Sequence, residues 1–72
     1  MATYSRQHFE ATAQILGQRI GHAQKEGDQG AVFALRQVAQ EFRYLFACEN
    51  GRFDAGRFKS RIDEVAAGVN RA

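Results

Sequence analysis

Apolar residues recur at alternating spacings of three and four between Asp28 and Gly51, and this is the strongest pattern in the chain. The apolar line comprises Val32, Leu35, Ala39, Phe42 and Phe46, with Ala31, Val38 and Leu45 on its flanks. This spacing is the period of one helix face and is sustained for about four turns. It predicts a helix over about 29–50 that ends at Asn50-Gly51, with Gly51 in the left-handed conformation. We interpret this helix as the central one, against which the rest of the chain packs.

A second apolar line predicts a helix over about 5–26. Its members are Phe9, Ala13, Leu16, Ile20 and Ala23, and Ile15 lies beside the line as a candidate to widen it. Ser5 is a good N-cap, and Tyr4 and Phe9 fall at the two positions of a hydrophobic staple. Gly27 is suited to the left-handed residue that follows a helix. The turn from 25 to 30 is short, so the two long helices are expected to pair antiparallel.

Two glycines interrupt the first predicted helix. Gly17 and Gly21 are four residues apart, in line with Ala13, and each costs up to about 1 kcal/mol relative to alanine. One interpretation is a smooth groove that lets another backbone approach closely. The other is that the helix simply tolerates two glycines.

The segment after Gly51 predicts a shorter third helix over about 55–67. Asp54 is a good N-cap, and Phe53 and Phe58 form a second staple. The apolar side consists of Phe58, Ile62 and Val65, with Val69 as a further candidate. Gly68 and Asn70 predict a frayed end. The whole chain, 1–72, is therefore expected to be one all-α domain, a long antiparallel helical hairpin with a third helix packed against it.

The size of the chain makes its stability marginal. A chain of 72 residues buries only roughly 60% of its unfolded surface, and such domains often gain stability from disulfides, metals or self-association. Cys48 is the only cysteine, so no disulfide can form within the chain. His8 and His22 are fourteen residues apart and lack metal-ligand spacing. We expect no metal and no cofactor, which leaves self-association open.

Composition favours an ordinary globular protein, with 44% apolar and 25% charged residues. The lone cysteine favours a reducing, cytoplasmic compartment. The opening MATYSRQHFE lacks a signal-peptide pattern, and no apolar run is long enough to span a membrane. Cys48 is expected to be a small, partly buried filler. Neither histidine has a nucleophile partner in the sequence, so we expect no enzymatic activity.

A second line of residues at helical spacing lies on the opposite side of the helix predicted over about 29–50. It comprises Phe33, Gln37, Gln40 and Tyr44, and positions 33 and 44 are only about 20° apart in projection. A simple hairpin does not bury this line. It is either an interface with another molecule, a surface covered by the third helix, or a set of isolated exposed residues without a role.

Basic residues cluster around the start of the third helix. Arg57, Lys59 and Arg61 are candidate nucleic-acid contacts, because a short basic helix after a turn is typical of a DNA-recognition helix. Nearby acidic residues dilute this charge, and the net charge of the chain is only +2. An ordinary solvated face is the alternative interpretation.

The opening TYSRQHFE and the block FACENGRFDAGRF resemble small proteins encoded by bacteriophages of actinobacteria. Many of these carry a Phe-Ala-x-x-Asn-x-Arg-Phe-Asp-x-x-Arg-Phe segment. The matching positions here are Phe46, Ala47, Asn50, Arg52, Phe53, Asp54, Arg57 and Phe58. Family members often have proline at the position of Gly51. The resemblance implies a phage or prophage origin but no activity. Together with the single cysteine, this origin leads us to expect a cytoplasmic location in the host cell.

These observations lead to three functional hypotheses. The first is a non-enzymatic phage protein that acts through protein–protein contact and self-associates as a two-fold dimer through the second line of the central helix. The second is a small DNA-binding regulator that uses the third helix. The third is an inhibitor of a host protein, which would need the same kind of exposed helical face.

Overall fold

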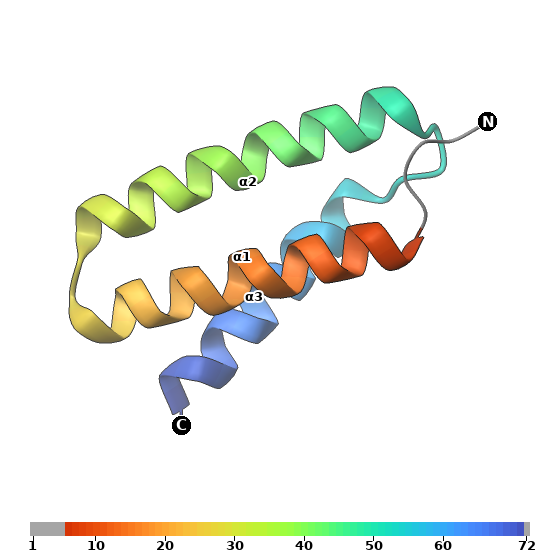
Figure 1. The fold of residues 1–72 in the computed structure, drawn as a ribbon. Helices are drawn as coiled ribbons and strands as arrows, with labels where there is room; N and C mark the ends of the chain where they lie inside the picture. Colours follow the sequence, from red (N-terminus) through yellow and green to blue (C-terminus); the bar gives the residue numbers. More distant parts are fainter. Residues whose placement is uncertain (1–5, 72) are drawn as a thin grey trace.

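Three α-helices form the computed structural model, which describes residues 6–71 (Figure 1). Helix α1 spans Arg6–Glu26, α2 spans Gln29–Glu49 and α3 spans Ala55–Arg71, and the described residues contain no strand. The first two helices have 21 residues each and the third has 17. The predicted all-α fold, a long hairpin with a shorter third helix, is confirmed. The predicted N-cap Ser5 and staple residue Tyr4 lie outside the described residues.

The turn between α1 and α2 follows the predicted capping chemistry. Gly27 has a φ of 74°, its N–H donates to the Gln24 carbonyl at 3.1 Å, and the Asp28 N–H donates to the Ala23 carbonyl at 2.9 Å. These two bonds satisfy carbonyls that the end of α1 would otherwise leave unpaired. The Asp28 carboxylate accepts from the Ala31 N–H at 3.0 Å and so caps α2. The short turn therefore fixes the antiparallel pairing of the two helices.

The end of α2 differs from the prediction. Asn50 is extended, with φ of −143° and ψ of 110°. Its side-chain oxygen accepts from the Arg52 N–H at 2.9 Å, and its carbonyl accepts from the Phe53 N–H at 3.0 Å. Asparagine thus makes the turn with its own side chain. The prediction that Gly51 is left-handed is wrong, because Gly27 is the one described glycine with a positive φ.

The central helix is α1, which lies between α2 and α3 (Figure 1). Its buried residues are Ala13, Leu16, Gly17, Ile20, Gly21 and Ala23. In α2 only Phe46 is fully buried, and the rest of its apolar line is half-buried or exposed. The interpretation of 29–50 as the central helix is therefore wrong. The reason is that α3 packs chiefly against α1 and contacts α2 at only a few positions, among them Phe58 against Phe46.

Gly17 and Gly21 explain why α3 lies so close to α1. A β-carbon added to Gly17 would lie 2.6 Å from Val65 Cβ, and one added to Gly21 would lie 2.7 Å from Val69 Cβ. In each case a carbonyl oxygen of α3 also lies within 2.9 Å of the added atom. The groove interpretation of the two glycines is therefore confirmed, and α3 fills the groove. We call this α1–α3 contact the glycine seam.

An aromatic cluster joins the three helices near the end of the hairpin that is remote from its turn. Its members, five of the six phenylalanines, are Phe9, Phe42, Phe46, Phe53 and Phe58. Phe46 is only 1% exposed, and its ring centroid lies 4.7 Å from that of Phe9 and 5.7 Å from that of Phe58. The Phe53 and Phe58 rings are 5.4 Å apart, which confirms the second staple. Tilted and edge-on pairs of this kind add to the stability from area burial alone.

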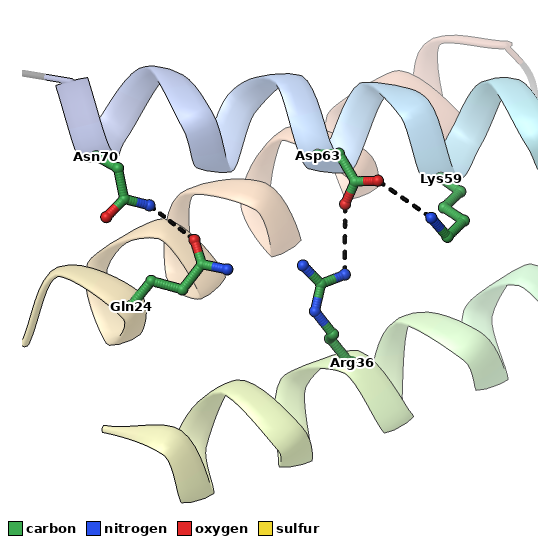
Figure 2. A network of polar contacts seen from close by, with 5 residues as sticks. All are labelled: Gln24, Arg36, Lys59, Asp63 and Asn70. Carbon is green, nitrogen blue, oxygen red and sulfur yellow. Dashed lines mark hydrogen bonds and ion pairs between the residues drawn. The ribbon is translucent and has the colours of Figure 1, made fainter. Parts of the chain in front are cut away.

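Helix α3 continues to Arg71, beyond the predicted end near residue 67. The Asn70 side-chain amide donates to Gln24 Oε1 at 2.7 Å and to the Ala66 carbonyl at 3.0 Å (Figure 2). The packing of Val69 on Gly21 adds a contact in the same turn. The prediction of a frayed end is wrong, because these contacts connect the last turn of α3 to the end of α1.

Candidate interaction surface

The line of Phe33, Gln37, Gln40 and Tyr44, which we call the outer stripe, is exposed along its whole length. Phe33 is 67% exposed and Tyr44 is 74% exposed, the two highest values among the large hydrophobic residues described. The alternative that α3 covers this side is therefore wrong. Because α3 lies along the glycine seam, it is held against α1 and away from the outer stripe.

The outer stripe and the buried side of α2 point in different directions. At 100° per residue, the four positions of the stripe fall within about 60° of one another. Phe46, the fully buried residue of α2, projects about 150° from the centre of the stripe. The stripe is thus on the outside of the hairpin, where no described element covers it.

Most of the large hydrophobic residues that are exposed belong to α2. Within residues 6–71 they are Phe33, Val38, Tyr44 and Leu45 on α2, and Ile15 on α1. The sequence pattern assigned Val38 and Leu45 to the flanks of the core, but they are 39% and 40% exposed. Ile15, at 60%, does not widen the buried face of α1. Four of the five residues lie on one helix, so α2 is the element best suited to contact another molecule.

The polar contact between α2 and α3 is weak. Arg36 Nη1 lies 3.3 Å from Asp63 Oδ1, and Lys59 Nζ lies 3.2 Å from Asp63 Oδ2 (Figure 2). The Arg36 and Asp63 side chains are 44% and 41% exposed, so this pair is worth about 0–1 kcal/mol. An open cleft of about 530 Å³ adjoins the same residues. Helix α2 is therefore attached mainly through α1 and the aromatic cluster.

The three candidate nucleic-acid contacts do not form one face. Arg57 and Arg61 line an open groove of about 810 Å³ between the starts of α1 and α3, whereas Lys59 lines the cleft beside Asp63. Arg61 Nη1 is 3.6 Å from Glu64 Oε2. The Arg57 N–H donates to Asp54 Oδ1 at 3.0 Å, which confirms Asp54 as the cap of α3.

The groove that contains Arg57 and Arg61 has an apolar floor and a mixed rim. The floor is made by Phe9, Phe53 and Phe58, and the charged rim by Arg6, Arg52, Arg57, Arg61, Glu10, Asp54 and Glu64. Arg6 Nε lies 3.5 Å from Glu10 Oε1. Four arginines face three carboxylates, so the groove carries little net charge.

The remaining candidate chemistry is dispersed over the surface. Cys48 is exposed, so the expectation of a partly buried filler is wrong. His8 and His22 are also exposed. Within residues 6–71, no group of three or more histidine, cysteine or acidic side chains could hold a metal ion. No helix in this part of the chain is long and apolar enough to cross a membrane.

Comparisons with protein-family models, curated proteins and solved structures find no match to this chain. The surface of the molecule is therefore the guide to its function. Its most distinctive part is the outer stripe.

Proposed function

We propose that this chain is a non-enzymatic, phage-encoded protein that acts through protein–protein contact and forms a two-fold homodimer through the outer stripe. The observation that carries the proposal is the exposure of Phe33 and Tyr44 on a helix with one fully buried residue. Aromatic residues are enriched in protein interfaces. The resemblance of the block from Phe46 to Phe58 to actinobacteriophage proteins supports the phage origin.

A second copy is the partner that the fold favours. The chain is short, and self-association is a common way for small domains to gain stability. Fully burying a phenylalanine contributes about 1.5–3 kcal/mol, so four rings that are about two-thirds exposed contribute roughly 4–8 kcal/mol per dimer. The rings are one part of the interface, and association has an entropic cost that offsets part of their contribution, so we expect a weak dimer. Two hairpins that meet through one helix each form a four-helix arrangement.

Light scattering after size exclusion tests the proposal at a loading of about 50 µM, in the range of a weak complex. We expect the wild-type chain to have the mass of a dimer and the Phe33→Asp, Tyr44→Asp double variant to have the mass of a monomer. Ile15→Asp is the control, because it places an aspartate on an exposed apolar residue outside the stripe. This control should remain a dimer.

Circular dichroism of all three proteins shows whether the helices survive the substitutions. A monomeric wild-type chain would refute self-association. A double variant that keeps the dimer would show that the interface lies elsewhere.

A further inference from the structure

The outer stripe continues by one residue at each end, and the extended line reads the same in both directions. Its members are Gly30, Phe33, Gln37, Gln40, Tyr44 and Ala47, all of them exposed. The spacings are three, four, three, four and three residues. The residue types are small, aromatic, amide, amide, aromatic and small. Both orders are symmetric about the midpoint between Val38 and Ala39.

Alternating spacings of three and four are the a and d positions of a coiled-coil seam. Such a seam allows side chains of one helix to fit between those of a facing helix. When two copies of one helix meet antiparallel about a two-fold axis, each residue faces the one at the mirrored position. The symmetry of the line therefore sets which side chains would meet.

We infer that two copies of the chain pair through antiparallel α2 helices, with the two-fold axis passing between Val38 and Ala39. Phe33 then faces Tyr44 of the second copy, and Gln37 faces Gln40 of the second copy. This inference rests on the proposed function and adds the orientation and register of the dimer.

The chemistry of each layer supports this register. Glutamine amides both donate and accept hydrogen bonds, so the two central layers can satisfy each other. The aromatic layers lie on either side of the amides. Beyond each of them lies a layer of Gly30 and Ala47, which leaves room for the rings. A shift of the register by one layer would place rings against amides and leave buried amide groups unpaired, which costs about 1–3 kcal/mol per group.

The dipoles of the two helices favour the antiparallel orientation. Antiparallel packing brings the positive end of one helix dipole next to the negative end of the other, whereas parallel packing would place like ends together. Parallel packing would also place Gly30 of one copy against Gly30 of the other, so that neither residue could fill the space at that end. The antiparallel arrangement gives both ends the same volume of side chains.

Engineered disulfides test the register without changing the rings or the amides. The background is Cys48→Ser, which removes the exposed native thiol. Positions 30 and 47 are about 25 Å apart along one helix, so cysteines there cannot bond within a chain. An added Cβ at Gly30 would meet its nearest neighbour, Asp28 Oδ1, at 3.7 Å, an ordinary contact.

We expect the Gly30→Cys, Ala47→Cys double variant to become a covalent dimer on mild oxidation. Each single variant should remain uncrosslinked, because the antiparallel register keeps identical positions about 25 Å apart. Light scattering on the reduced proteins reports self-association separately. Dimers whose single variants crosslink would show parallel packing and overturn the register while leaving the proposed function in place. Dimers without any crosslink would also overturn the register. Monomers in light scattering would refute the proposed function and the register together.

Discussion

Replacing Gly17 by alanine tests the contact that determines the arrangement of the helices. The added β-carbon would lie 2.6 Å from Val65 Cβ, 2.8 Å from the Ile62 carbonyl oxygen and 2.9 Å from Val65 Cγ1. The carbonyl oxygen cannot move without the backbone of α3. Val65 Cβ is bonded to the backbone and does not move when the side chain changes rotamer, and valine in a helix has one strongly preferred rotamer for its Cγ atoms. We therefore expect α3 to be displaced from α1.

Two opposing effects set the change in the free energy of unfolding that Gly17→Ala causes. Alanine in a helix interior is favoured over glycine by up to about 1 kcal/mol. Overpacking a close contact costs typically about 1–3 kcal/mol. The net effect of Gly17→Ala should be a loss of about 1–2 kcal/mol in the free energy of unfolding. A domain of this length is expected to have a total of roughly 4–11 kcal/mol, so the loss is substantial.

Gly68→Ala provides the matched control. Gly68 lies within α3, is exposed, and has no atom within 4 Å of an added β-carbon. This substitution should stabilise the protein by up to about 1 kcal/mol, because helix propensity acts without a clash. The difference between the two variants therefore isolates the cost of overpacking at the glycine seam.

Urea and thermal unfolding followed by circular dichroism provide the measurement. Dilute protein is needed, because self-association would add to the apparent stability. A change of 1 kcal/mol corresponds to roughly 4–8 °C in Tm for a domain of this size. If Gly17→Ala raised Tm as much as Gly68→Ala, the close approach of α1 and α3 would be refuted.

Two further predictions concern the core and a cap. Phe46→Ala should lower the free energy of unfolding by about 3–5 kcal/mol in urea unfolding, because Phe46 is buried in the aromatic cluster; a loss below about 1 kcal/mol would contradict that role. Asp54→Ala should cost about 1 kcal/mol in urea unfolding, whereas Asp54→Asn should lose less, because asparagine also accepts from the Arg57 N–H. Equal losses in the two Asp54 variants would show that charge, rather than the cap hydrogen bond, is responsible.

Features set by neighbours in the sequence could be predicted well. The caps at Asp28 and Asp54, the left-handed Gly27 and the Phe53–Phe58 staple each depend on residues within a few positions of one another. The same is true of the helix boundaries, which agree with the prediction to within a residue or two except at the end of α3. That end depends on Gln24, which is 46 residues away from Asn70.

The position of each helix in the fold could not be predicted in the same way. A strong apolar pattern shows that a helix has an apolar side, but it does not show how many neighbours the helix has. Helix α2 has the clearest pattern and only one fully buried residue. Helix α1 has two glycines in its pattern, and these positions form its contact with α3. Glycine has a low helix propensity, and in this chain the two glycines within α1 mark its most closely packed face.

The candidate site was predicted in part. The spacing of Phe33 and Tyr44 identified a line on one side of α2, but its exposure depended on the position of α3. The grouping of Arg57, Lys59 and Arg61 by sequence was less informative, because Lys59 is two residues from each of the others and so projects to a different side of the helix. The structure accordingly places it in a separate cleft.

The glycine seam and the exposed stripe result from the same packing arrangement. Without side chains at Gly17 and Gly21, α1 brings the backbone of α3 into direct contact and buries Val65 and Val69 at least in part. A third helix bound in this way contacts α2 at only a few positions, through the Phe46–Phe58 ring pair and the exposed Arg36–Asp63 ion pair. Helix α2 therefore keeps one side for α1 and leaves the other side open. This division gives a 72-residue chain both a core of its own and an apolar helix face that a second copy can cover.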